Sequence, residues 1–285
     1  MEVFNKRQFV GLALFLCGAY LAIAAIYIFR LPLVMDEFDG AFDVYRLHFH
    51  LPYRDFKPYK TVLGYYFQLA ALFPSLGVWN SMLVLKIQLA AVNALCMFVM
   101  TLRLSRLFSR ESGIFALLML VTTSTWLERS CELRVDALTA WPGLFSLLCL
   151  LNGSFFSAGL LGGLSFLVSQ KGIYYLLAGG ACALLLRFSK DAAGGKDAAF
   201  VRFAAGALLP LGLYFGLWSL VGTEQKAAEA TFYSHYQIVF ENIYHNRSKY
   251  WRQEGLRNPL FWLGTLLSLS VLFFHALSAL RRRKF

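Results

Sequence analysis

Stretches of predominantly apolar residues recur along the whole chain, and short polar segments separate them. A helix that crosses a bilayer needs ~20 mostly apolar residues. The pattern therefore predicts an all-α fold, a polytopic transmembrane helical bundle of about eight spans with juxtamembrane helices on its outer surface. The predicted spans are residues 9–29, 83–101, 113–127, 137–152, 156–170, 172–187, 201–221 and 258–280.

The segment between the first two predicted spans is also apolar over residues 61–80, but Gly64, Pro74 and Gly77 interrupt it. If this segment crossed the membrane, the basic cluster of Arg103, Arg106 and Arg110 would face outward. Cytoplasmic loops, however, are the ones that collect Lys and Arg. We therefore predict an interfacial or re-entrant helix on the outer surface.

The distribution of charge orients the predicted bundle. With the N-terminus in the cytoplasm, thirteen of the 27 basic residues fall on the cytoplasmic side together with only four of the sixteen acidic ones. This excess follows the positive-inside rule and predicts a multi-pass protein with both termini in the cytoplasm. The thirteen are Lys6, Arg7, Arg103, Arg106, Arg110, Arg187, Lys190, Lys196, Arg202, Arg281, Arg282, Arg283 and Lys284.

Composition narrows the class of protein further. Hydrophobic residues make up 58% of the chain and charged residues 15%, which is too apolar for a soluble domain. Topology and contact with anionic lipid explain the basic excess, and no nucleic-acid-binding motif accompanies it.

The five cysteines lie mostly in apolar runs without CxxC spacing, which indicates that they pack against neighbouring helices. Glycines at 159, 162, 163, 179 and 180 predict close approach between helices.

The outer face holds the other twelve acidic residues, and it is where we expect a site. The first group is Met-Asp-Glu-Phe-Asp at 35–39, directly after the first span. Asp36 and Glu37 would stand at the carboxyl end of a spanning helix, where the macrodipole opposes negative charge. Carboxylates beside a bilayer cost free energy unless they are paired or used, so this placement indicates function. A solvated start of the loop is the alternative.

Two further groups lie where predicted spans turn on the outer face. In Glu-Leu-Arg-Val-Asp at 132–136, Arg134 suits a phosphate and Asp136 suits a hydroxyl or a metal. An ion pair at a helix end is the alternative. Lys171, within Ser-Gln-Lys-Gly at 169–172, lies between the fifth and sixth spans, where a lysine can equally extend its ammonium to the membrane interface.

Taken in order and on one face, these groups resemble the GT-C superfamily of membrane glycosyltransferases. The resemblance rests on the acidic pair after the first helix, Pro-Tyr-Arg-Asp-Phe at 52–56, Arg-x-Asp before the fourth helix and the Ser-Gln-Lys-Gly turn. It is greatest to the protein O-mannosyltransferase and aminoarabinose transferase group and their bacterial relatives. It implies a compact member in the bacterial inner membrane, with a catalytic module at 1–190 whose first outer loop is 30–82. Two spans and an outer loop at 223–258 then make up 191–285.

The resemblance also implies a reaction and roles for residues. A sugar would pass from a polyprenyl-phosphate donor to an acceptor hydroxyl on the outer, periplasmic face, with inversion at the anomeric carbon. Asp36 would be the general base, while Glu37 and Asp136 would orient acceptor or donor. Cations would stabilise charge that develops on the departing phosphate; the candidates are Arg54, Lys57, Arg134 and Lys171. The candidates for acceptor contact or a lid are Tyr53, Asp55, Tyr244, His245 and Arg247. The last three lie in an outer loop rich in aromatic and basic residues, for which an interfacial belt of Trp and Tyr is the alternative.

The same resemblance sets the expected cofactors and partners. The superfamily allows a divalent metal near Asp36 and Glu37, but close relatives largely work without one. His48 and His50 are also poorly spaced for ligation on one helical face, so no cofactor is expected to be required. The expected partners are the lipid-linked donor, membrane lipid, and a glycan, lipid or protein acceptor. Because relatives usually contain more spans, a membrane partner subunit is the alternative to a compact member that works by itself.

Two other classes of function stay open. One is a non-catalytic subunit or scaffold of a membrane glycan-assembly complex, and the other is a transporter of lipid-linked sugar. Transporters built from inverted repeats place polar residues at mid-membrane in matching halves, whereas the ionisable residues here gather at the outer ends of the predicted spans. This distribution disfavours transport and leaves the scaffold as the stronger alternative.

Overall fold

The structure, a computed structural model, consists of helices joined by short connections. It describes residues 4–30, 33–58, 61–68, 77–187, 196–233, 256–259, 261–267 and 270, and none of these forms a β-strand. The helices are α1 (Lys6–Arg30), α2 (Met35–Arg46), α3 (Leu63–Gln68), α4 (Gly77–Leu107), α5 (Arg110–Thr122), α6 (Ser124–Ser130), α7 (Val135–Leu151), α8 (Phe155–Val168), η3 (Gln170–Gly172), α9 (Ile173–Arg187), α10 (Lys196–Leu220), α11 (Glu224–Ala228) and η4 (Glu229–Tyr233).

Three helices are long and apolar enough to cross a membrane, namely α1, α4 and residues 198–220 of α10. Helices α6 and α7 pass the same test together, with a bend of 116° between them. The predicted all-α class is therefore confirmed for the described residues, and three or four candidate spans among them support the predicted membrane class. The number eight stays a prediction, because α5, α8 and α9 contain 13, 14 and 15 residues. Such helices measure roughly 20–22 Å against a hydrocarbon core of ~30 Å.

Two predicted segments have other boundaries in the structure. Residues 113–127 do not form one helix, because the extended backbone of Thr123 separates α5 from α6. At this break the Thr123 hydroxyl donates a hydrogen bond to the Met119 carbonyl, a side-chain bond that competes with the helical backbone pattern. Within 61–80, the described helix is the short α3, and the last four residues already belong to α4. Helix α4 begins at Gly77, whose φ of 72° is one that glycine adopts readily. Most of the predicted span 258–280 lies outside the described residues.

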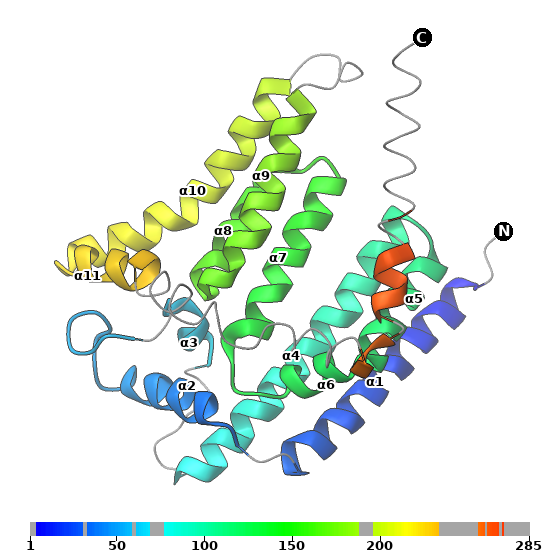
Figure 1. Cartoon of the computed structure of the whole chain (residues 1–285), viewed down its shortest axis with the longest axis horizontal. Coiled ribbons are helices and arrows are strands. Elements are labelled where there is room, and N and C mark those ends of the chain that lie inside the picture. Colours follow the sequence, from blue (N-terminus) through cyan, green and yellow to red (C-terminus); the bar gives the residue numbers. More distant parts are fainter. Residues whose placement is uncertain are drawn as a thin grey trace.

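The helices form two groups that lie side by side (Figure 1). One group contains α1, α4 and α5, and the other contains α7, α8, α9 and α10. In the second group, Gly159 of α8 and Gly206 of α10 bring the two helices together. A Cβ atom on Gly159 would overlap the backbone of Phe203, and one on Gly206 would overlap that of Phe156. The predicted packing role of Gly159 is thereby confirmed.

A small buried polar network holds the bend between α6 and α7 against the first group. The Asn93 side chain of α4 donates to the Ser130 carbonyl at 2.9 Å and accepts from the Trp141 indole at 2.7 Å. The Tyr20 hydroxyl of α1 donates to the Ser130 hydroxyl at 3.0 Å. Buried polar groups need partners, so these bonds fix four helices relative to one another.

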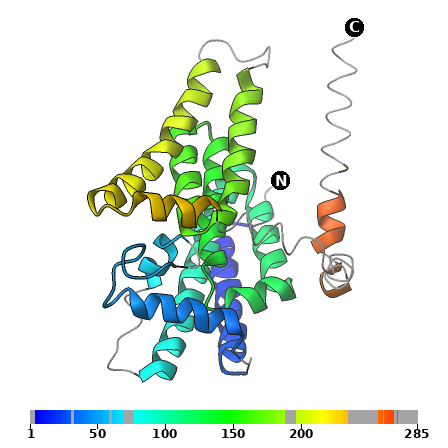
Figure 2. The same cartoon turned by 60° about the vertical axis from the view of Figure 1, so that its left-hand side comes forward.

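The helices begin and end at two opposite ends of the bundle (Figures 1 and 2), and the residues at these two ends differ in chemistry. The basic end contains the amino ends of α1, α5 and α8 and the carboxyl ends of α4 and α7. There the Arg110 side chain donates to the Phe4 carbonyl at 2.8 Å, which joins the starts of α5 and α1. The opposite end contains the amino ends of α2, α4 and α7, the carboxyl end of α1 and η3. We call it the acidic end after Asp36 and Glu37 in the first turn of α2 and Asp136 in the first turn of α7, although basic side chains pair with them there. All described candidate site residues lie at the acidic end.

Candidate functional site

Asp36 and Glu37 lie in the first turn of α2 rather than at the end of the first spanning helix. Helix α1 ends at Arg30, and Val34 precedes α2 with an extended backbone. The Glu37 carboxylate accepts the Val34 backbone N–H at 3.0 Å, which closes this first turn. A helix N-terminus favours negative charge. The expectation that the macrodipole opposes these carboxylates was therefore wrong, because the polar segment after α1 starts a second helix.

Glu37 is a buried anchor. Its side chain is 1% exposed, and Oε1 lies 2.8 Å from Nζ of Lys86, which is itself 4% exposed on α4. The same carboxylate accepts the Leu133 backbone N–H at 2.9 Å. Glu37 thus joins α2, α4 and the connection between α6 and α7. Its predicted role of orienting a substrate stays a prediction. Lys86 was missed by sequence reasoning, although a lysine within an apolar span signals a partner.

Asp36, the neighbour of Glu37, points the other way. Its side chain is 62% exposed, and Oδ2 lies 2.6 Å from Nη2 of Arg134. The Nε atom of Arg134 lies 2.8 Å from Oε2 of Glu132, so one guanidinium holds two carboxylates. The structure therefore brings together the first and second candidate groups, which lie almost a hundred residues apart in the sequence.

Asp136 and Lys171 form a second ion pair beside the first. Asp136 lies in the first turn of α7, and its Oδ2 accepts from Nζ of Lys171 at 2.6 Å. Lys171 lies in η3, where a Cβ on Gly172 would overlap the backbone of α8, so this tight turn needs the glycine. Since Arg134 and Asp136 flank Val135, the two ion pairs meet at the amino end of α7. The second and third candidate groups are thus joined as well.

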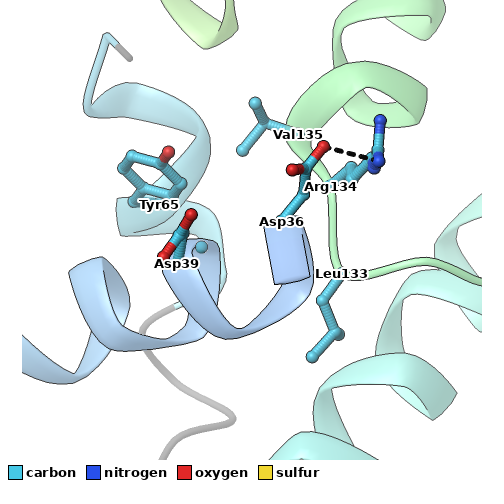
Figure 3. Close-up of a pocket in the computed structure, with 7 residues that line it drawn as sticks. Asp36, Asp39, Tyr65, Leu133, Arg134 and Val135 are labelled. Carbon is cyan, nitrogen blue, oxygen red and sulfur yellow. Dashed lines mark ion pairs between the residues drawn. The ribbon is translucent and has the colours of Figure 1, made fainter. Parts of the chain in front are cut away.

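A cavity of about 130 Å³ opens beside the first ion pair. Asp36, Asp39 and Gly40 of α2, Tyr65 of α3 and residues 133–135 line it, and Figure 3 shows the Asp36 carboxylate directed at Arg134. Asp39 is exposed, and within the described part of the chain no ion pair or hydrogen bond engages its side chain. Sequence reasoning missed Asp39 and Tyr65 as lining residues. The three-residue spacing of Asp36 and Asp39 was the available signal, because it places both on one helix face.

The first outer loop carries two more ion pairs. Arg54 Nε donates to Asp55 Oδ1 at 2.8 Å, and Lys57 Nζ donates to Glu229 Oε1 at 3.0 Å. The Arg54 side chain, followed by the Leu51 backbone N–H, lowers the pKa of Asp55 to about 2. Neither Arg54 nor Lys57 lines the cavity beside Asp36.

Tyr53, predicted for acceptor contact or a lid, packs against α10 in the structure, and the predicted contact stays a prediction. Tyr53 is 2% exposed, and its hydroxyl lies 2.6 Å from that of Tyr214 on α10. Its ring stands edge-on to Trp218. Burial, followed by the neighbouring Tyr214, raises the pKa of the Tyr53 hydroxyl well above its usual range. The φ of 64° at Tyr53 lies in the left-handed region that non-glycine residues rarely adopt. The loop is therefore held in an uncommon conformation against α10.

Three predicted site residues and the prediction about a metal are not tested by the described part of the chain. Tyr244, His245 and Arg247 fall outside the described residues. Among the described ones, no group of three His, Cys, Asp or Glu side chains is placed to hold a metal ion. The expectation that no metal is required stays a prediction.

Chemically, the acidic end combines an exposed carboxylate with fixed cations a few ångströms away. A carboxylate can accept a proton from a hydroxyl, and a guanidinium or ammonium can bind a phosphate. Each of the four predicted phosphate-binding cations already has a carboxylate partner: Arg54, Lys57, Arg134 and Lys171. An arriving phosphate would have to share or replace those partners.

Comparisons of the chain with protein-family models, with curated proteins and with solved structures found no match.

Proposed function

We propose that this protein is an integral membrane glycosyltransferase of the GT-C type, which moves a sugar from a polyprenyl-phosphate donor to an acceptor hydroxyl at the acidic end. In this proposal the acidic end faces the periplasm, both termini lie in the cytoplasm, and about eight spans cross a bacterial inner membrane. The basic residues at the other end support that orientation through the positive-inside rule.

The observation that carries the proposal is the meeting of three separate sequence motifs at one end of the bundle. Asp36 lies 2.6 Å from Arg134, and Asp136 lies 2.6 Å from Lys171. A packed bundle does not require exposed ion pairs, which contribute at most about 1 kcal/mol to stability. Their convergence at one end of the bundle, with Asp36 and Arg134 lining a cavity, is instead the arrangement that acid–base and phosphate chemistry needs.

The roles follow from exposure and charge. Asp36 is exposed and lines the cavity, so it acts as the general base that takes the acceptor proton. Arg134 binds the donor phosphate and leaves Asp36 as the phosphate arrives, which frees the carboxylate for the proton. Lys171 adds a second positive charge, and Asp136 holds it in place. Asp39, in the same cavity, is the second candidate base.

The test is a transfer assay in proteoliposomes. A polyprenyl phosphate carrying a radiolabelled hexose is offered with a panel of lipid, glycan and peptide acceptors, and Asp36→Asn, Asp39→Asn and Asp136→Asn are compared with the parent. Loss of a general base lowers the rate by about 10²–10⁴-fold, and this loss is expected for Asp36→Asn. The matched control is Glu224→Gln, which removes an exposed carboxylate from α11, outside the cavity, and it should keep the full rate.

Two outcomes would contradict the proposal. If Asp36→Asn and Asp136→Asn insert, fold and transfer sugar at the parent rate, the assigned site is wrong. If Asp39→Asn alone loses activity, the reaction stands but the base is Asp39.

The second candidate function is a non-catalytic subunit of a glycan-assembly complex. The observation that favours it is the pairing of each predicted phosphate-binding cation with a carboxylate, which is what a purely structural helix end would also show. A purified chain that transfers no sugar, yet restores transfer when mixed with a membrane fraction lacking it, would support this function.

A further inference from the structure

A second cavity, of about 500 Å³, opens at the basic end, far along the bundle from the candidate site. The carboxyl-terminal turns of α4 and α7, the connection between α7 and α8 and the first two turns of α8 line it. Its volume falls within the range of small-molecule sites. Nothing in the proposed transfer reaction uses it.

One wall of this cavity is positively charged. Arg103 and Arg106 stand three residues apart on α4, and therefore on one helix face. Within the described chain, neither guanidinium has a carboxylate at ion-pair distance, in contrast to the paired cations at the acidic end. Two arginines that share a cavity without a counter-charge favour binding of an anion, and arginine suits phosphate because its planar fork contacts two oxygens.

The opposite wall is partly polar and partly apolar. Asn152 and Ser154, between α7 and α8, and Ser157, in the first turn of α8, supply amide and hydroxyl groups. Phe145 and Leu161 add apolar surface deeper along the helices. The cavity therefore offers hydrogen bonds and charge toward the end of the bundle and apolar contact toward its middle. A free phosphate ion would use only the first half of this surface.

The location matches the depth of lipid headgroups. Helix α4 is of spanning length, and its two arginines lie in its last two turns, where the end of a spanning helix meets the headgroup region. Basic pockets between helices on the cytoplasmic side are suited to anionic headgroups, which are abundant in that leaflet. The basic end is cytoplasmic in the orientation proposed above.

From these observations we infer that the cavity between α4, α7 and α8 binds the phosphate headgroup of an anionic phospholipid, with Arg103 and Arg106 as the phosphate contacts. The upper parts of the acyl chains lie against Phe145 and Leu161. The inference does not depend on the glycosyltransferase activity.

The experiment measures lipid binding to the purified full chain in detergent by native mass spectrometry. Phosphatidylglycerol is titrated against the parent, against Arg103→Gln/Arg106→Gln, and against the control Lys6→Gln/Arg7→Gln. The control removes two exposed cations from the same end of the bundle, outside the cavity. Phosphatidylcholine and inorganic phosphate are the comparison ligands.

The inference predicts that the Arg103/Arg106 double variant binds phosphatidylglycerol about 30-fold more weakly, as expected for the loss of two interfacial cations, while the control changes less than threefold. Ser157→Trp, which fills the cavity from an exposed position and leaves the charges in place, should weaken binding as well. This variant keeps the test decisive if the double variant fails to fold.

Equal losses in the arginine variant and in the control would overturn the inference, since the effect would then be general surface attraction. Tight binding of inorganic phosphate that competes with the lipid would also overturn it, in favour of a free-anion site. Binding of phosphatidylcholine as strong as that of phosphatidylglycerol would show that the arginines do not select a net negative headgroup.

Discussion

The buried pair of Glu37 and Lys86 is the contact on which the candidate site is built, and Lys86→Met tests it. The substitution keeps a long apolar side chain but removes the cation that lies 2.8 Å from the Glu37 carboxylate. The carboxylate would then keep only its two backbone partners, the N–H groups of Val34 and Leu133. It would stay buried as a charge without a counter-ion.

The magnitude follows from that burial. Removing one partner of a buried ion pair costs about 3–5 kcal/mol, because the other charge remains desolvated. At roughly 2–4 °C per kcal/mol for a chain of this size, the unfolding midpoint should fall by roughly 6–20 °C. Adding Glu37→Gln to Lys86→Met removes the stranded charge, while the amide oxygen can still accept a backbone N–H. The double variant should therefore recover at least half of the lost stability.

Thermal unfolding in detergent, followed by the fluorescence of the six tryptophans, measures these midpoints. Lys226→Met is the control, since this lysine is exposed on α11, and surface substitutions usually change stability by less than about 0.5 kcal/mol. The reasoning is refuted if Lys86→Met unfolds within ~2 °C of the parent, a shift of under about 1 kcal/mol. It is equally refuted if the double variant is less stable than Lys86→Met alone.

Three further predictions concern packing and charge. Asn93→Leu removes the hydrogen-bond partner of the buried Trp141 indole N–H and of the buried Ser130 carbonyl. The free energy of unfolding should therefore fall by about 1–3 kcal/mol, and an unchanged thermal midpoint would argue against the network. Gly206→Leu should force α8 and α10 apart and lower the midpoint well below that of Gly212→Leu, where a side chain has open space; equal midpoints would contradict the close packing. The pKa of Asp55 is lowered from 3.8 to about 2 by Arg54, so the stabilising contact should be complete above pH 3.8 and lost as the pH falls through about 2. A carboxyl titration by NMR with a midpoint near 3.8 would show that the ion pair does not form.

Part of the candidate site was predictable because short sequence patterns at the ends of apolar runs indicate it. An acidic residue that follows an apolar run, and an Arg-x-Asp before the next one, mark helix ends whatever the packing. Asp36, Arg134 and Asp136 were identified in this way, and Lys171 was identified from the Ser-Gln-Lys-Gly turn between two apolar runs. The structure brings these residues together at the acidic end. Which residue pairs with which was not predictable, because each ion pair joins segments far apart in the sequence.

The sequence by itself predicts a helical membrane protein, because its apolar runs are long. A bilayer requires apolar side chains and a backbone whose polar groups are hydrogen-bonded internally. Only the tertiary structure showed that residues adjacent in the sequence differ in burial and in their ion-pair partners. Asp36 and Glu37 are adjacent, yet one is 62% exposed and the other 1%, because successive helix residues point about 100° apart. It also placed Lys86, from another helix, beside the buried carboxylate. Burial and pairing depend on contacts between distant segments, and no local pattern records them.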